Sequence, residues 1–209
     1  MRNVNDLIEK AISLRDRGLR AGEIADELNI SRETATWLLT RARKEGGAPS
    51  AAAPKDIFID WSTIGRSSSR LMLVATCMAD MIEEVLNDLD TNVDVVVGIA
   101  LSGVPLANVV AYQYGVELGV MHPGKHQAEV GKQQQAKPSM SEHYASVKGK
   151  RCVIVDDVIT TGSTMEEATK FIEDQGGETV AIAVMLDKRG SDTVKDVPVR
   201  SLIKIGRIE

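Results

Sequence analysis

The chain has 209 residues, of which 43% are hydrophobic and only 3% aromatic, and its formal net charge at pH 7 is −5. This length allows one large domain, or a medium and a small one, and the hydrophobic content supports a mainly aliphatic core. No long apolar stretch or charged-then-apolar leader is visible, so we expect a cytoplasmic protein without a membrane partner. Cys77 and Cys152 lie in apolar segments and are expected to be buried thiols rather than a disulfide.

The first part of the chain has the pattern of a small all-α domain. Apolar residues recur at helical spacing over residues 4–14, and Gly18 is expected to end that helix in a left-handed conformation. A second, short helix is predicted over residues 21–28, followed by a tight turn at Asn29, which tolerates positive φ. Ser31 is predicted to cap a third helix.

The second and third of these helices resemble a helix-turn-helix of the DNA-binding kind. The resemblance rests on residues 23–38, in which the small Ala25 allows two helices to cross closely. It implies that residues 1–45 bind double-stranded DNA with the third helix in the major groove. The residues of that helix expected to contact bases or phosphates are Ser31, Arg32, Glu33, Thr36, Trp37, Arg41 and Arg43. The alternative is a three-helix oligomerisation or docking domain.

A segment with the composition of a linker, residues 46–55, separates this domain from a second domain over residues 56–209. Short apolar runs alternate with helical patterns in the second domain. Strands are predicted at residues 56–61 and 93–100, within 108–121 together with a turn, and at 152–155 and 179–186, and helices at 70–89 and after Pro105. This alternation predicts an α/β fold with a mostly parallel sheet covered on both faces. Ligands of such folds bind at the carboxyl ends of the strands.

Residues 152–164 are the most informative segment. A buried strand is followed by two carboxylates, Asp156 and Asp157, then by a loop of hydroxyl residues around Gly162 and a helix that begins near Met165. Such a loop offers backbone N–H groups and hydroxyls to an anion at a helix N-terminus. The two carboxylates would repel a bare phosphate, but they suit sugar hydroxyls or a Mg²⁺ ion carried by the ligand. The alternative is an ordinary crossover whose hydroxyls only cap the helix.

This segment closely resembles the signature of the type I phosphoribosyltransferases. The resemblance implies that the acidic pair holds the ribose hydroxyls of 5-phosphoribosyl-1-pyrophosphate (PRPP) and that the loop holds its 5-phosphate. The expected PRPP-binding residues are Asp156, Asp157, Val158, Thr160, Thr161, Gly162, Ser163 and Thr164. The position at which orotate phosphoribosyltransferases hold pyrophosphate is matched by Ala100, Leu101, Ser102 and Gly103. No metal site made by the protein alone is expected, because Mg²⁺ would arrive with PRPP.

Three departures from these enzymes weaken the case for catalysis. Ser102 stands where a lysine usually precedes the glycine of the pyrophosphate loop. The loop that closes over the reacting groups corresponds to residues 122–137, which keep positive charge but not the acidic-His-Gly pattern. Lys188 replaces an arginine that helps to grip orotate, and Arg189 is the candidate to compensate in the base or effector pocket. An active transferase would use as catalytic residues Lys125, His126 and Asp157.

Taken whole, the chain resembles the archaeal orotate-phosphoribosyltransferase-like transcriptional regulators, which join an N-terminal helix-turn-helix to a phosphoribosyltransferase domain. This resemblance implies control of sugar-catabolism genes. It predicts a DNA-binding regulator that forms a homodimer through the phosphoribosyltransferase-like domain, with PRPP or a related phosphosugar or nucleotide as its effector. One rival interpretation is an active phosphoribosyltransferase for orotate or another nucleobase. Another is a bifunctional enzyme and regulator.

Overall fold

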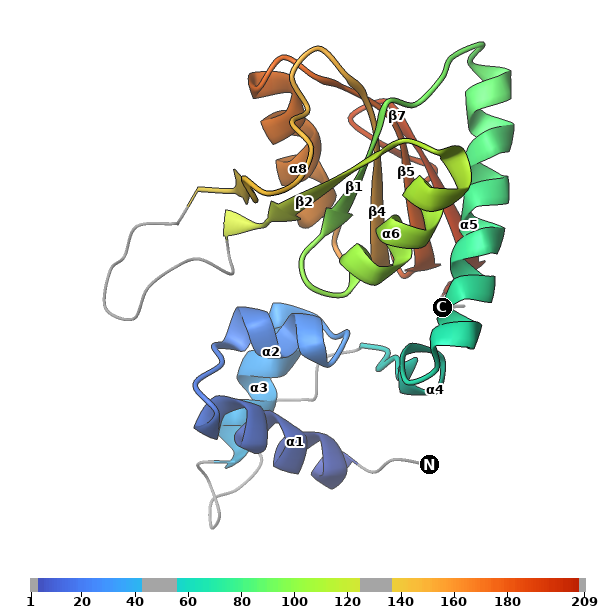
Figure 1. Cartoon of the computed structure of the whole chain (residues 1–209). Coiled ribbons are helices and arrows are strands. Elements are labelled where there is room, and N and C mark those ends of the chain that lie inside the picture. The colour runs from blue at the N-terminus through green and yellow to red at the C-terminus, as the bar shows by residue number, and fades with distance from the viewer. Residues whose placement is uncertain (1–3, 43–55, 125–136, 207–209) are drawn as a thin grey trace. The chain divides into compact units, whose positions relative to one another are not determined.

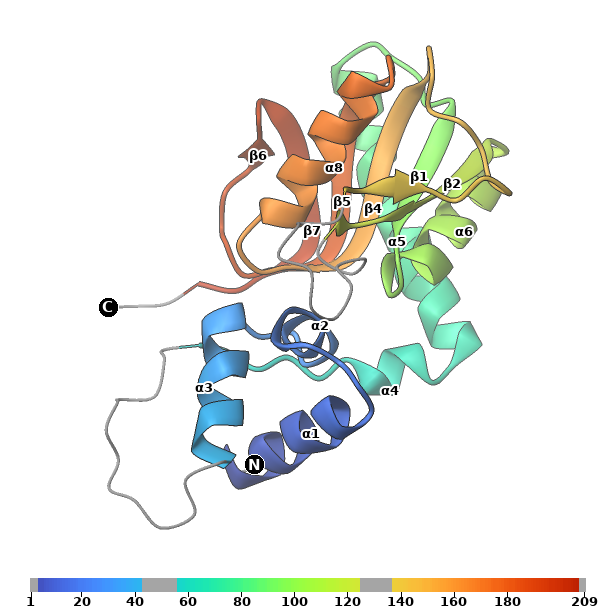
Figure 2. The same cartoon turned by 90° about the vertical axis from the view of Figure 1, so that its left-hand side faces the viewer.

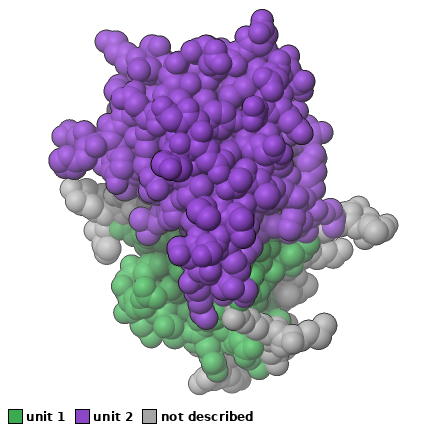
Figure 3. All heavy atoms as spheres, turned by 45° about the vertical axis from the view of Figure 1, so that its right-hand side comes forward, with its two compact units in different colours: residues 1–61 green, residues 62–209 purple. Residues whose placement is uncertain are grey.

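The structure, a computed structural model, describes residues 4–42, 56–124 and 137–206 (Figure 1). The chain divides into two compact units, Met1–Trp61 and Ser62–Glu209 (Figure 3). Residues 56–61, which the sequence pattern assigned to the second domain, belong to the first unit. Among the residues described, no helix has both the length and the apolar character needed to cross a membrane.

In its described part, the first unit contains α1 (Val4–Asp16), α2 (Ala21–Glu27) and α3 (Arg32–Ala42), which agree with the predicted helices. Gly18 (φ +97°) and Asn29 (φ +53°) adopt the left-handed conformation expected after α1 and α2. Ala25 is buried, as expected for a small residue at a close helix crossing. The core shared by the three helices consists of Ala11, Leu14, Ile24, Ala25, Leu28, Ile30, Ala35 and Leu38.

Residues 56–61 were predicted as a strand, and this prediction is wrong. The segment is not part of any strand and belongs to the helical unit. One carboxylate oxygen of Asp56 accepts hydrogen bonds from the backbone N–H of Ser31 (2.6 Å) and from the hydroxyl of Thr34 (2.9 Å). The Phe58 side chain packs against the core of the three helices. The apolar residues of this segment are thus partly covered by helices, which a local alternating pattern does not distinguish from pairing in a sheet.

The second unit is built around a sheet with the strand order β3-β2-β1-β4-β5-β7-β6 (Figures 1 and 2). The strands are β1 (Val95–Ile99), β2 (Glu117–His122), β3 (Ser139–Met140), β4 (Arg151–Ile159), β5 (Glu178–Asp187), β6 (Thr193–Val194) and β7 (Val197–Lys204). Pairing is parallel between β2 and β1, β1 and β4, β4 and β5, and β5 and β7. The edge strands β3 and β6 pair antiparallel. The prediction of a mostly parallel sheet is therefore confirmed.

Helices cover both faces of this sheet. The covering helices are α5 (Ser68–Asp88), α6 (Gly103–Tyr114) and α8 (Ser163–Asp174), and the short α4 (Ser62–Gly65) packs against α5. Helices α5 and α6 pack on one face and α8 packs on the other (Figures 1 and 2). Every residue of β1 is buried, because a strand covered on both faces has no solvent side. The predicted α/β fold is confirmed.

Two local assignments in the second unit differ from the sequence analysis. Residues 108–114, assigned to a strand and its turn, form the second half of α6, which ends at the left-handed Gly115 (φ +64°). No element was predicted for the hairpin of β6 and β7, although β7 pairs along β5. The strand β7 contains a proline and lacks a continuous apolar run, so its sequence does not have the pattern that identified the central strands.

The two cysteines differ in exposure. Cys152 is buried in β4, as expected, and this burial raises the pKa of its thiol to about 12. Cys77 on α5 is exposed, so the expectation of two buried thiols is wrong for this residue. The apolar composition of α5 extends to its outer side, where Met72 and Leu73 are also exposed. Composition around Cys77 therefore did not predict burial.

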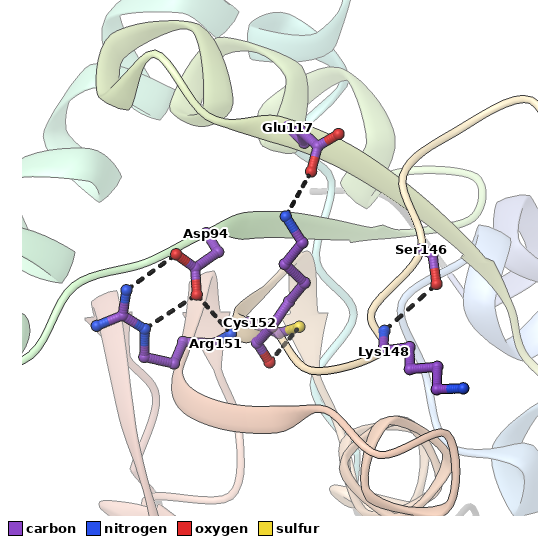
Figure 4. A network of polar contacts seen from close by, with 7 residues as sticks. Asp94, Glu117, Ser146, Lys148, Arg151 and Cys152 are labelled. Carbon is purple, nitrogen blue, oxygen red and sulfur yellow. Dashed lines mark hydrogen bonds and ion pairs between the residues drawn. The ribbon is translucent and has the colours of Figure 1, made fainter.

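The strands β1 and β4 are joined at their amino-terminal ends by an ion pair. Arg151 donates hydrogen bonds from Nε to one carboxylate oxygen of Asp94 and from Nη2 to the other, each 2.9 Å long (Figure 4). The Arg151 backbone N–H adds a third bond of 2.9 Å to the same carboxylate. The side-chain hydrogen bonds from Arg151 are the main reason that the pKa of Asp94 falls to about 2. The amino-terminal ends of these two strands are thus held together by an ion pair within the protein.

Candidate functional site

The predicted ligand site lies where the sheet changes winding direction. After β1 the chain crosses to β2 on one side, whereas β4 lies on the other side of β1. The loops that leave β1 and β4 at their carboxyl ends therefore diverge from two neighbouring parallel strands. Such switch points are the usual ligand-binding positions of open α/β sheets. Both loops singled out by the sequence, residues 100–103 and 160–164, emerge here.

The acidic pair lies within β4 rather than after it. The predicted strand ended at residue 155, but β4 continues to Ile159 because it remains paired with β5. Its pairing with β1 ends at Val155, so from Asp156 onward β4 extends beyond β1. Asp156 is 8% exposed and Asp157 is 7% exposed, and the Asp157 N–H donates to Asp156 Oδ1 at 2.9 Å. The carboxylates are thus held on a rigid strand and not on a loop.

The predicted pyrophosphate loop lies against this acidic strand. A Cβ atom added to Gly103 would lie 2.5 Å from the Val155 carbonyl oxygen and 3.0 Å from Asp156 Oδ1, so only glycine fits this close approach. Ser102 precedes α6 and makes no side-chain capping hydrogen bond. Leu101 is 79% exposed, and the peptide bond between Ala100 and Leu101 is cis. The predicted pyrophosphate loop and the acidic pair, which are far apart in the sequence, therefore lie together at the ends of β1 and β4.

The predicted phosphate loop leads directly into α8. The helix begins at Ser163, two residues before the predicted start, so Ser163 and Thr164 lie in its first turn. Its N-cap residue is Gly162 (φ +89°), which supplies no side-chain hydrogen bond to the helix end. The hydroxyl oxygens of Thr161 and Ser163 lie 3.1 Å apart. Thr161 Oγ1 also accepts the Ser163 N–H at 3.4 Å, so the loop supplies one hydroxyl to the helix end although the N-cap itself is a glycine.

Three residues at the end of β5 lie beside the predicted phosphate loop. Lys188 is half-buried, and its backbone N–H donates to the Ile159 carbonyl oxygen at 2.9 Å. Arg189 packs its side chain on Gly162 of the phosphate loop. Residue 187, an aspartate that the sequence analysis did not select, is fully buried at the same strand end. Asp187 could have been recognised in the sequence as an acidic residue at the end of an apolar strand.

The predicted catalytic set is only partly described. Asp157 lies in β4, whereas Lys125 and His126 fall outside the described residues. Within residues 4–42, 56–124 and 137–206, no group of three or more His, Cys, Asp or Glu side chains could hold a metal ion.

The predicted DNA-contacting residues of α3 are mostly exposed. The exposed members are Arg32, Glu33, Thr36 and Arg41, and Arg43 lies outside the described residues. Ser31 caps the helix, since its Oγ accepts the Thr34 N–H at 3.1 Å. Trp37 is half-buried against the helical core, with the Arg41 guanidinium 5.0 Å from its ring centroid. Thr40 is exposed one turn after Thr36, and its hydroxyl donates to the Thr36 carbonyl oxygen at 2.8 Å.

Comparisons with known proteins identify the family and the fold of this chain. A family model described as the phosphoribosyl transferase domain matches residues 60–208. The chain is 78% identical to the transcriptional regulator GfcR of Methanocella arvoryzae, and the alignment covers 100% of both chains. It is 48% identical to GfcR of Methanosarcina mazei, again over 100% of both. The chain belongs to the GfcR family of transcriptional regulators. The resemblance seen in the sequence is thereby confirmed.

Solved structures show the fold of this GfcR-family chain. The orotate phosphoribosyltransferase of Aeropyrum pernix is 21% identical, with a TM-score of 0.56, and the match covers 76% of this chain and 84% of that one. An orotate phosphoribosyltransferase of Mycobacterium tuberculosis, solved in complex with PRPP, is 20% identical with a TM-score of 0.51, covering 70% of this chain and 80% of that one. The GfcR-family chain thus has the type I phosphoribosyltransferase fold with helices added at its N-terminus.

Proposed function

We propose that the protein is a DNA-binding transcriptional regulator whose phosphoribosyltransferase-like unit binds PRPP, or a related phosphosugar or nucleotide, as effector. The observation that carries this proposal is the convergence of the acidic strand, the glycine of the pyrophosphate loop and the hydroxyl-rich start of α8 at one switch point. Relatives named as transcriptional regulators over the full chain length support regulation rather than catalysis as the role of this site.

The effector would contact three groups. Asp156 and Asp157 accept hydrogen bonds from ribose hydroxyls, which suits carboxylates fixed on a strand. Residues 160–164 hold the 5-phosphate through hydroxyls and backbone N–H groups at the start of α8. Residues 100–103 hold the pyrophosphate, and Mg²⁺ would be bound chiefly by its oxygens, since Mg²⁺ commonly binds through substrate phosphates and few carboxylates.

The first unit would bind DNA through the exposed side of α3. Arg32 and Arg41 supply positive charge there, and Glu33 and Thr36 can reach base edges. A single small helix-turn-helix usually reads only a half-site, and specific operators are read by dimers. We therefore propose a homodimer formed through the second unit. By the family resemblance, the target genes would include those of sugar catabolism.

An active phosphoribosyltransferase is the second candidate, because the acidic strand and phosphate loop have the arrangement that such an enzyme also needs. Ser102 and Lys188 stand in positions where the enzymes carry a lysine and an arginine, so we rank this candidate below the regulator. Steady release of pyrophosphate from PRPP with orotate or another nucleobase would favour it.

The decisive experiment selects genomic DNA fragments on the purified protein at physiological salt, with and without magnesium PRPP. Salt is controlled because phosphate contacts alone can imitate recognition. We expect a few fragments that share an inverted repeat, with a yield that PRPP changes by about 5- to 150-fold, the usual range of allosteric coupling. Random recovery in both conditions would contradict DNA recognition.

A matched variant pair tests the effector site. Asp156→Asn with Asp157→Asn should abolish the response to PRPP and leave basal DNA binding unchanged, because the two sites lie in different units. Asp94→Asn, the same chemical change at the opposite end of the strands, should retain the response. Equal loss of DNA binding and PRPP response in the folded double variant would argue against separate sites.

A further inference from the structure

The chain that leaves β5 passes beside the predicted phosphate loop. The last pair of residues between β4 and β5 is Ile159 with Asp187, and the Lys188 N–H donates to the Ile159 carbonyl oxygen at 2.9 Å. Residues 160–164 continue directly from β4 at this point. The β5 exit and the phosphate loop are therefore neighbours because the strands are parallel and end together.

Arg189 makes direct contact with this loop. A Cβ atom added to Gly162 would lie 3.2 Å from Arg189 Nη1 and 3.3 Å from Arg189 Cδ, so the side chain packs on the glycine backbone. Arg189 Nη2 donates to the Ser191 carbonyl oxygen at 3.0 Å. Arg189 Nε is buried and has no hydrogen-bond partner within the described chain. A buried donor without a partner is unfavourable, and a bound acceptor would relieve that cost.

Asp187 fixes the position of Arg189. Its Oδ1 accepts hydrogen bonds from the backbone N–H of Arg189 (2.7 Å) and of Gly190 (3.2 Å), which closes a tight turn at the end of β5. The Asp187 side chain is fully buried, with 0% exposure. Its other oxygen, Oδ2, is buried without a hydrogen-bond partner in the described chain, and the two bonds to Oδ1 fix the backbone from which the Arg189 side chain extends to the loop.

We propose that Arg189 binds the 5-phosphate of the effector together with residues 160–164, and that Asp187 is its positioning residue. This inference rests on the proposed function, because it assigns a role within the same effector site. It departs from the expectation that Arg189 belongs to the base pocket. A guanidinium is suited to phosphate because its planar donors match two phosphate oxygens. Its charge also offsets the repulsion that Asp156 and Asp157 exert on a phosphate.

The test uses ribose 5-phosphate, which carries the 5-phosphate and ribose hydroxyls but neither base nor pyrophosphate. Its binding to the full-length protein is measured by titration calorimetry beside magnesium PRPP, with ribose as the unphosphorylated control. Arg189→Gln should weaken both phosphorylated ligands by about 10- to 100-fold, the loss expected for a charge-assisted hydrogen bond. The affinity of Arg189→Lys should lie between those of the wild type and Arg189→Gln, because lysine keeps the positive charge but lacks the planar set of guanidinium donors. Lys170→Gln removes an exposed cation from α8 and should bind as the wild type.

The possible results distinguish failure of the role proposed for Arg189 from failure of the proposed effector site. Normal affinity of Arg189→Gln for ribose 5-phosphate, in a protein that binds it when unmutated, would overturn the role of Arg189 and leave the proposed effector site standing. Loss of affinity only for orotidine 5′-monophosphate would place Arg189 at the base instead. A wild type that binds neither ribose 5-phosphate nor PRPP would overturn the effector and this inference together. Thermal denaturation checks the fold, and Arg189→Lys decides the matter if Arg189→Gln does not fold.

Discussion

The two predicted functions are assigned to the N-terminal ends of α3 and α8. The backbone N–H groups at these two helix ends find different hydrogen-bond partners. At α3 the Ser31 hydroxyl accepts the Thr34 N–H, and the Asp56 carboxylate accepts hydrogen bonds from both of these residues. At α8 the N-cap is Gly162, which has no side chain, and the Ser163 N–H donates to Thr161 Oγ1 at 3.4 Å. Of these two helix ends, the one at α8 is therefore the more open to a bound anion, whereas α3 has the carboxylate of its own chain at that position. We infer that α3 contacts DNA through side chains and that α8 contacts the effector through its backbone as well.

The largest effect is expected at the open end. In Gly162→Ala the backbone would be strained at φ +89° and the new methyl would press on Arg189. We expect PRPP affinity to fall by roughly 100-fold, or about 3 kcal/mol. Calorimetric titration with magnesium PRPP measures this. The matched control is Gly176→Ala, which has a similar φ of +79° at the far end of α8 but no atom within 4 Å of the added carbon. Equal loss in both variants would mean that the effect is general destabilisation.

A smaller effect is expected at the N-terminal end of α3, where the Asp56 carboxylate is the acceptor. Asp56→Ala removes the acceptor of the Ser31 N–H and the Thr34 hydroxyl, so the free energy of unfolding of the first unit should fall by about 2 kcal/mol. Hydrogen exchange of the α3 backbone amides should become faster and DNA affinity should decrease, while PRPP binding stays unchanged. Asp16→Ala, which removes an exposed carboxylate paired with the adjacent Arg15, is the control and should cost less than about 1 kcal/mol. Unchanged α3 exchange in Asp56→Ala would contradict the role given to this carboxylate.

The smallest effect is expected for a carboxylate that closes neither helix end. Asp94 has its pKa lowered from 3.8 to about 2 by Arg151, so its ionised form stabilises the fold. Because the folded pKa lies below the unfolded one, this stabilisation is complete above about pH 4 and is lost as pH falls through about 2. Asp94→Asn should lower the free energy of unfolding by about 1 kcal/mol, since the pair is partly exposed. Denaturation of both proteins should show a constant gap from pH 5 to 8 that shrinks below pH 4. A gap that persists at pH 2 would exclude the ion pair as its source.

Particular residues show which parts of the structure the local sequence pattern could predict and which it could not. The buried runs of β1, β4 and β5 and the periodic helices α1 to α3 were predicted because their spacing reports burial directly. Residues 56–61 were misassigned because an alternating apolar segment can be covered by a sheet or by helices. The hairpin of β6 and β7 was not predicted because its strands lie at one edge of the sheet, where mixed composition is tolerated. Cys77 was misjudged because α5 is apolar beyond the side it buries.

The sequence by itself determined the three N-terminal helices, the central strands, the α/β class, the phosphoribosyltransferase signature and the resemblance to a family of regulators, since each depends on residues close together in the chain. Tertiary structure decided which distant residues meet. Gly103 packs on Asp156 because the end of β1 lies beside β4, and Arg189 packs on Gly162 because β5 ends beside it. Asp56 reaches Ser31 only because the segment after the linker returns to the helices. Such contacts follow from strand order and chain path, and local periodicity carries no information about either.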